Sequence, residues 1–170
     1  MEVKRATVKD IELLQDLFSQ AISWQKQRGV PTFTNFTSSF FEQEINKRSV
    51  FAAWHQERLV GTVSLYESDD IIWENDKEPA LYIHRLTSLR GEIGRGVGAA
   101  LIEWSRWQAK DRNKKWLRVD CWAENRDLCK FYERQGFERV RDKNTGENPA
   151  LPKHYQKIEL RLFQMGIKAA

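Results

Sequence analysis

The chain has 170 residues, of which 31% are charged and 41% hydrophobic, and a formal net charge of +4. This length suits one compact domain over residues 1–170, and the two cysteines are too few for a secreted disulfide framework. No apolar run approaches the roughly 18 residues that span a membrane, and the small positive excess forms no Lys/Arg tract, so neither a membrane nor nucleic acid is an expected partner.

The chain opens with MEVKRATVKDIELL, which lacks an apolar signal core and a cleavage site, so we expect a cytoplasmic protein. Residues 3–8 alternate like a strand, and Thr7 with Asp10 predicts a capping-box start for a helix that Gly29 ends. The apolar residues of this helix recur at helical spacing: Ile11, Leu14, Leu17, Phe18 and Ala21.

An aromatic stretch, residues 32–45, predicts a second, short helix. Residues 50–66 are two apolar runs around a polar HQER turn, the pattern of an antiparallel hairpin. Residues 68–79 read as an acidic linker, and residues 80–89 as a strand. Six acidic residues near this linker predict a negative field that would attract a cationic amine: Glu67, Asp69, Asp70, Glu74, Asp76 and Glu78. A merely solvated linker is the alternative.

The second half of the chain alternates helices and strands. After the glycines of 91–98 a helix continues to about residue 113, followed by a strand at 116–122 and a helix at 125–135. Strands are predicted at 137–142 and 154–162. An early hairpin with later β-α-β crossovers indicates an α/β or α+β fold around one mixed sheet.

Four glycines lie between the strand ending near Ser88 and the next helix: Gly91, Gly94, Gly96 and Gly98. Glycines let the main chain press against a ligand, and the N-terminus of the following helix presents N–H groups and a positive dipole end. The pattern predicts an anion site, with Arg90 and Arg95 as additional charges. A glycine-rich turn without a ligand is the plain alternative.

The string GRGVGA, residues 94–99, also satisfies the dinucleotide fingerprint, with Asp120 near the position of a ribose-binding acid. Against a dinucleotide-binding protein, these glycines lie several residues beyond the strand and in mid-chain. The residues after Asp120 are also too few to build the second half of a doubly wound sheet.

The strand YIHRLTSL, the segment GRGVGAALIEW, the strand WLRVDCW and the string NRDLCKFYERQGF together resemble the GCN5-related N-acetyltransferase (GNAT) superfamily, most clearly over residues 80–140. The resemblance implies a mixed, V-shaped sheet of six or seven strands flanked by about four helices. It also implies acetyl-CoA as the cofactor, with CoA as product.

The family's pyrophosphate loop falls on Ile93 to Gly98, where Ile93 replaces the usual Gln or Arg. A side-chain contact is therefore missing or supplied by Arg90 or Arg95, while main-chain N–H groups keep the phosphate site. The resemblance implies these cofactor-binding residues: Leu86, Thr87, Ser88, Ile93, Gly94, Arg95, Gly96, Val97, Gly98, Ala99, Asn125 and Tyr132. Asn125 is equally a helix N-cap, a role compatible with a cofactor contact.

Acetyl transfer to an amine needs a base for the ammonium, a donor for the oxyanion and a proton for the leaving thiolate. The resemblance makes Tyr132 the acid, near the sulfur, and places a base on the strand 80–89. Our candidate base is His84, since imidazole titrates at about pH 6.5. Asp120 and Glu124 are reserve bases. Core packing of Tyr132 and a structural role for His84 remain the alternatives.

An acyl-cysteine route through Cys129 is disfavoured because no histidine lies at helical spacing from it. The cysteines and histidines show no metal-binding spacing, so no metal is expected. Several aromatic residues are candidates to roof an acceptor cleft: Trp24, Phe33, Phe36, Trp73 and Tyr155.

The sequence thus predicts an acetyl-CoA-dependent N-acetyltransferase that acts on a primary amine of a small molecule or peptide by direct transfer in a ternary complex. The alternatives are a catalytically inactive CoA-binding sensor or scaffold and, more remotely, a dinucleotide-binding protein. The acceptor, any acyl group other than acetyl and the formation of a homodimer stay open.

Overall fold

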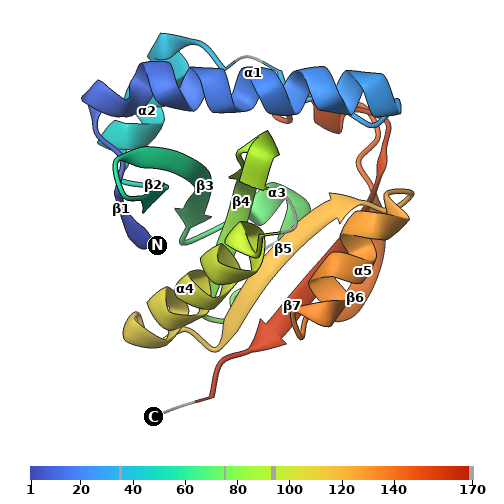
Figure 1. Cartoon of the computed structure of the whole chain (residues 1–170). Helices are drawn as coiled ribbons and strands as arrows, with labels where there is room; N and C mark the ends of the chain where they lie inside the picture. The colour runs from blue at the N-terminus through green and yellow to red at the C-terminus, as the bar shows by residue number, and fades with distance from the viewer. Residues whose placement is uncertain (35, 75, 93–94, 169–170) are drawn as a thin grey trace. The chain divides into compact units, whose positions relative to one another are not determined.

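The computed structural model describes residues 1–34, 36–74, 76–92 and 95–168 (Figure 1). The chain forms two compact units. Unit 1 comprises Met1–Leu65 and Arg85–Trp104, and unit 2 comprises Tyr66–His84 and Ser105–Ala170.

Unit 1 contains a three-stranded antiparallel arrangement. Strand β1 (Glu2–Arg5) pairs with β2 (Val50–His55), which pairs with β3 (Arg58–Tyr66), so the predicted hairpin is confirmed. Gly61 in β3 is needed because a Cβ there would lie 2.9 Å from the carbonyl oxygen of Thr87. Thr87 belongs to the second half of β4 (Ala80–Ser88), so the two strands approach closely at this point.

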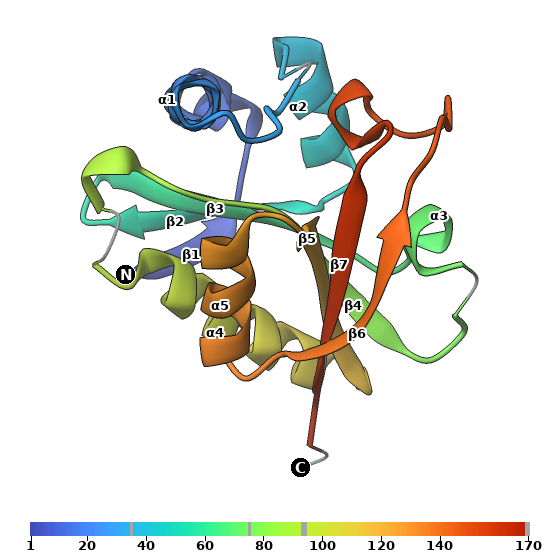
Figure 2. The ribbon, with the colours of Figure 1, turned by 90° about the vertical axis from the view of Figure 1, so that its right-hand side faces the viewer.

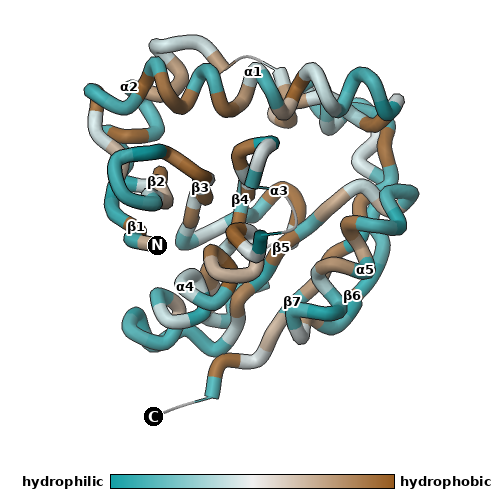
Figure 3. Tube along the Cα trace, viewed as in Figure 1, coloured by the Kyte–Doolittle hydropathy of each residue, from teal (hydrophilic) through white to brown (hydrophobic). Residues whose placement is uncertain are grey.

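Helix α1 (Ile11–Arg28) begins and ends as the sequence predicts. The amide and hydroxyl of Thr7 donate to Oδ2 of Asp10 at 2.7 and 2.9 Å, ahead of a short 3-10 turn, Val8–Asp10. Gly29 ends the helix in the left-handed region, at φ 65°. The brown hydrophobic positions in Figure 3 recur along the helix, and the five predicted ones are all buried.

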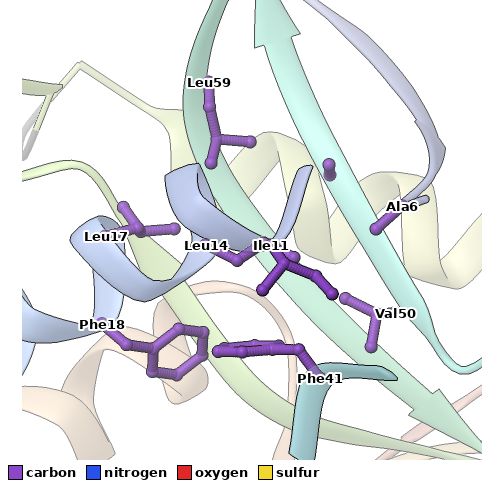
Figure 4. Close-up of a cluster of buried hydrophobic side chains, with 9 residues drawn as sticks. Ala6, Ile11, Leu14, Leu17, Phe18, Phe41, Val50 and Leu59 are labelled. Carbon is purple, nitrogen blue, oxygen red and sulfur yellow. The ribbon is translucent and has the colours of Figure 1, made fainter. Parts of the chain in front are cut away.

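The core of unit 1 lies under α1 and α2 (Ser38–Asn46) (Figure 4). The rings of Phe18 and Phe41 lie 5.5 Å apart, and Phe36 stacks on Phe18 at 4.3 Å. Phe33 and Phe36, candidates for an acceptor cleft, therefore pack against this core. Its buried members are Ala6, Ile11, Leu14, Leu17, Phe18, Phe41, Val50, Ala52 and Leu59.

Unit 2 is built on the first half of β4 and on β5 (Trp116–Trp122), which pair in parallel. Strand β7 (Glu159–Gly166) lies antiparallel between β5 and β6 (Glu138–Asn144), and Figure 2 shows β7 in red beside β6 in orange. Three successive residues of β4, Leu81, Tyr82 and Ile83, are buried. Both faces of this half-strand are therefore covered, as is usual for parallel strands.

The helices of this part of the chain are α3 (Asp70–Trp73), α4 (Val97–Asp111) and α5 (Arg126–Arg134), of which α4 has residues in both units. Helix α3 lies where the sequence predicted only a linker. Its four residues bury Ile72 and Trp73, and Trp73 packs in a cluster with Tyr82 and Leu162 instead of roofing a cleft.

The last strand begins at Glu159, so the predicted start at residue 154 is wrong. Residues Lys153–Tyr155 form a 3-10 turn, and Lys157 has a left-handed φ of 55°, which interrupts extended backbone before β7.

Neighbouring strands hydrogen-bond in the order β1-β2-β3-β4-β5-β7-β6. The seven strands mix parallel and antiparallel pairs, and the described residues contain five α-helices, which confirms the predicted α/β class and mixed sheet. Within the described ranges, no helix has the length and apolar character needed to cross a bilayer.

Candidate active site

The predicted phosphate loop leads into α4 in unit 1. Gly96 directly precedes the helix in the left-handed region, at φ 83°, and a Cβ built on it would meet no atom within 4 Å among the described residues beyond its chain neighbours. The amide of Ala100 donates to the Gly96 carbonyl at 2.9 Å. Gly98 and Ala99 lie in the first turn of α4. The N–H groups of a first helical turn have no intrahelical acceptor. Ile93 and Gly94 lie outside the described residues.

The two arginines near this loop have partners in unit 1. Arg90 places its guanidinium 4.2 Å from the ring of Trp24, on which Arg28 also stacks at 5.0 Å. The exposed Arg95 contacts Glu92 at 3.4 Å, and Arg58 contacts the same carboxylate at 3.3 Å. Exposed ion pairs of this kind contribute little to stability, about 0–1 kcal/mol, so a bound anion can compete for Arg95.

The segment Leu86, Thr87 and Ser88 follows a backbone irregularity. Arg85 has a left-handed φ of 51°, which is rare for a residue with a side chain and ends the simple alternation of faces along β4. Thr87 is buried and its hydroxyl donates to the Arg85 carbonyl at 3.1 Å, while Leu86 and Ser88 are half-buried. Simple strand alternation therefore does not define which face Leu86 and Ser88 occupy relative to the first half of β4.

A buried acid on α2, which the sequence analysis did not single out, holds Arg85 in place. Glu44 is 5% exposed and its Oε2 lies 3.4 Å from the Arg85 guanidinium. Arg85 also lies over the ring of Phe40, at 5.0 Å. These contacts compensate the strained conformation at Arg85 within unit 1.

In unit 2, Tyr132 on α5 is buried and its ring packs against Phe131, Phe137 and Phe163. Burial, with smaller contributions from Cys121, Asp120 and Cys129, raises the pKa of the Tyr132 phenol well above its usual value. The hydroxyl therefore holds its proton at neutral pH. The structure thus supports core packing by Tyr132. Its role as the acid for the leaving thiolate stays a prediction.

Asn125 is the N-cap of α5. Its Oδ1 accepts from the amide of Leu128 at 3.2 Å, so the predicted capping role is confirmed. This bond uses the carbonyl oxygen of the side chain and leaves its NH₂ group for another acceptor.

His84 lies in a polar cluster of unit 2. Its Nε2 is 3.0 Å from Oδ2 of Asp69, and the side chains of His84 and Asp69 are 21% and 12% exposed. Asp120 on β5 brings a second carboxylate. One ring nitrogen of His84 and one carboxylate oxygen each of Asp69 and Asp120 lie within 4.8 Å of one another. The hydroxyl of Tyr155 donates to Asp120 Oδ2 at 2.7 Å. The sequence analysis named His84, Asp120 and Tyr155 separately but did not bring them together.

The environment favours the protonated forms of Asp120 and Tyr155. Burial raises the pKa of the Asp120 carboxyl, although His84 and the Tyr155 hydroxyl oppose this effect. Burial and the neighbouring Asp120 charge raise the pKa of the Tyr155 phenol well above its usual value. Glu124, the other reserve base, is exposed.

The cysteines lie beside one another in unit 2, with Sγ atoms 3.7 Å apart, and both are buried free thiols. Burial, together with Cys129, raises the pKa of Cys121 far above its ordinary value. Because the thiolate is the nucleophile, this environment does not favour acyl-cysteine chemistry at Cys121.

The acidic segment before β4 is largely neutralised. Four of its six carboxylates contact basic side chains of unit 2: Glu67 with Arg112 and Lys114, Glu74 with Arg141 and Lys143, Asp76 with Arg118, and Glu78 with Lys115. The broad negative field predicted from the sequence is therefore reduced, and Asp69 directs its carboxylate at His84.

Comparisons with known proteins agree with the fold and the motifs. The model of the "Acetyltransferase (GNAT) family" matches residues 12–137. The chain belongs to this family. It is therefore an acyltransferase of the N-acetyltransferase type, and GNAT enzymes generally take their acetyl group from acetyl-CoA.

A relative named as the uncharacterized N-acetyltransferase YesJ of Bacillus subtilis (strain 168) is 29% identical over 142 residues, which are 78% of this chain and 79% of the relative. A GNAT-family acetyltransferase from Listeria monocytogenes 4b F2365 superposes with a TM-score of 0.73 at 21% identity, covering 97% of this chain and 94% of that one. The ribosomal-protein-alanine N-acetyltransferase of Brucella melitensis gives a TM-score of 0.74 at 17% identity, covering 98% and 99%. Both structures share the fold.

Proposed function

We propose that the protein transfers the acetyl group of acetyl-CoA directly to a primary amine of a small molecule or peptide, in a ternary complex. The observation that carries this proposal is Gly96, which enters α4 at φ 83° and whose Cβ position lies clear of the described residues beyond its chain neighbours. A glycine in this conformation at a helix N-terminus suits a diphosphate, because the backbone can approach the anion and the helix dipole favours its charge.

The residues present fit acetyl-CoA. The amides at the start of α4, from Val97 to Ala99, are the proposed diphosphate ligands, and Arg95 is the adjacent exposed cation. The family resemblance adds main-chain groups of Leu86 to Ser88 and the side-chain NH₂ of Asn125. When bound, acetyl-CoA supplies the acyl group in an activated thioester.

Two side chains of unit 2 carry the proposed proton chemistry. His84 takes a proton from the acceptor's ammonium group, which frees the nitrogen lone pair for attack. The Tyr132 hydroxyl serves the departing sulfur. The raised pKa makes this phenol a weak acid, so the role that we assign it is hydrogen-bond donation to the sulfur, ahead of complete proton transfer.

The acceptor class is a primary amine, on a small molecule or at a peptide terminus. One structural relative is named for a ribosomal-protein alanine, and GNAT enzymes in general acetylate amines. Most carboxylates before β4 are paired with basic side chains. Asp69 and Asp120 are the acidic groups next to the proposed base, and this setting suits a cationic amine.

Calorimetry with CoA and acetyl-CoA, followed by a thiol-release assay over a panel of amines and peptides, tests the proposal. We expect binding at micromolar concentrations and thiol release with at least one acceptor class. An absence of binding at these concentrations contradicts the cofactor assignment. Binding without turnover on the whole panel contradicts the transferase and favours a CoA-binding sensor.

A further inference from the structure

Four side chains that are distant in the sequence meet around His84 in unit 2. Asp69 comes from the segment before α3, His84 from β4, Asp120 from β5 and Tyr155 from the 3-10 turn before β7. The side chains of His84 and Asp69 are 21% and 12% exposed, and Asp120 is 9% exposed as a residue. The cluster is thus shielded on several sides while its histidine keeps access to solvent.

Asp69 occupies the N-cap position of α3 but does not cap the helix. Its side chain makes no capping hydrogen bond, and its buried Oδ2 lies 3.0 Å from Nε2 of His84. This short contact is not aligned as a hydrogen bond, so within the described residues Oδ2 has no well-formed donor. An aspartate at this position normally stabilises the helix. Its carboxylate instead contacts the imidazole, and the missing hydrogen bond to this buried oxygen costs stability.

Asp120 places a second carboxylate close to the same imidazole. Its Oδ2 accepts a 2.7 Å hydrogen bond from the Tyr155 hydroxyl. An ionised carboxylate beside an imidazole stabilises positive charge that develops on the ring. Such a setting stabilises the imidazolium that forms when a histidine acts as a base, as a buried aspartate does in hydrolytic triads.

Three further neighbours of the cluster within the described part of the chain are uncharged. The ring of Tyr66 meets His84 edge to face at 5.0 Å, and Cys121 and Tyr132 near Asp120 are neutral at physiological pH. Basic side chains of the neighbouring strands are paired elsewhere: Arg118 with Asp76, and Arg161 with Asp142.

We propose that Asp69 is a positioning residue that holds His84 as the base for the acceptor amine. This inference rests on the proposed function. The N–H bond of the ammonium group breaks, the proton moves to the imidazole, and the electron pair stays on the nitrogen that attacks the thioester. Asp69 orients the imidazole and stabilises the imidazolium, while the Tyr155 hydroxyl holds Asp120 close to the same ring.

The first measurement uses the protein without substrates, so that it does not depend on turnover. The chain has three histidines, and His84 is assigned in the NMR spectrum by comparison with His84→Gln. In Asp69→Asn, the midpoint of the His84 titration should move to lower pH by about one unit, because a neighbouring negative charge is lost. Asp70→Asn removes an exposed carboxylate one residue away and should leave the midpoint unchanged.

The second measurement is the pH dependence of kcat/KM. Asp69→Asn should lower kcat/KM at neutral pH by about 100-fold and move the acidic limb of the profile to lower pH, with acetyl-CoA affinity within twofold of wild type. Asp70→Asn should retain the wild-type rate and profile. A general loss of stability would lower the rate without moving the limb.

The outcomes separate the two proposals. A shifted His84 titration in a protein that acetylates no acceptor contradicts the proposed function but keeps the coupling of Asp69 to His84. An unshifted titration, or an unshifted acidic limb in an active Asp69→Asn enzyme, overturns the inference. It is also overturned if a chelator removes activity and a divalent cation restores it, because the cluster would then act by holding a metal ion.

Discussion

The hydroxyl of Tyr155 lies 2.7 Å from Oδ2 of Asp120, a 9% exposed residue whose carboxyl pKa is raised by burial. Because the folded state favours the protonated acid, the stabilising contribution of Asp120 is complete below the unfolded pKa of about 3.9. It is lost as the pH rises through the raised folded pKa. Ionisation of the folded Asp120 carboxyl therefore costs the protein stability, which is consistent with a role in function.

Replacing Asp120 by Asn should reveal the direction of this pH dependence of stability. The amide keeps the size of the side chain and does not ionise, so the variant should gain stability relative to wild type as the pH rises from 4 to 7. Urea unfolding across this range measures the difference in free energy. A variant that instead loses stability relative to wild type over the same range would show that the folded state favours the ionised carboxylate.

Gly96→Ala should lower the affinity for CoA about 10-fold or more, because a Cβ would occupy the open space proposed for the diphosphate. The substitution also strains a left-handed backbone, by about 1 kcal/mol. Gly29→Ala is the matched control, since Gly29 has φ 65°, open space around the Cβ position and a place at the end of α1. Calorimetry should find a weakened affinity in the first variant alone. Equal affinities in the two variants would remove the diphosphate assignment.

Tyr132→Phe should keep the ring packing against Phe137 and Phe163 and remove the hydroxyl. If this hydroxyl serves the leaving sulfur, kcat falls about 100-fold while the affinity for acetyl-CoA and the melting temperature stay near wild type. Steady-state thiol release and thermal unfolding provide the readouts. An unchanged kcat would assign Tyr132 to the core alone.

The sequence was sufficient to predict the elements that carry periodic patterns. The face of α1, the hairpin of β2 and β3, and the N-cap at Asn125 follow from residue spacing and side-chain chemistry that act over a few positions. The start of β7 was misplaced because HYQK contains no Gly, Pro, Asn or Asp that would separate it from the strand residues IELRL, whereas the left-handed Lys157 breaks the extended backbone there.

Other features depend on contacts between distant residues. Helix α3 is too short to form by itself, and the burial of Ile72 and Trp73 stabilises it within unit 2. The cluster around His84 draws on residues 69, 84, 120 and 155, and no local spacing connects them. Asp69 directly precedes α3, a helix that the sequence did not predict, and its side chain does not cap that helix.

Asp142 illustrates the opposite pH dependence. Hydrogen bonds from Nε and Nη2 of Arg161, both at 2.9 Å, lower the pKa of the Asp142 carboxyl, and Arg139 adds a contact at 2.6 Å. The stability that this pair contributes is present above the unfolded pKa of about 3.9 and is lost as the pH falls through the lowered folded pKa.

Asp142→Asn should therefore destabilise the protein by about 1.5–3 kcal/mol at pH 7, the range for hydrogen bonds to charged groups, and by progressively less toward pH 3. Asp16→Asn, at an exposed position of α1, is the control and should change the unfolding free energy by less than about 0.5 kcal/mol at either pH. Urea unfolding at pH 7 and pH 3 compares the two. A destabilisation by Asp142→Asn that stays constant between these pH values would show that the Arg161 contacts do not depend on the ionised carboxylate.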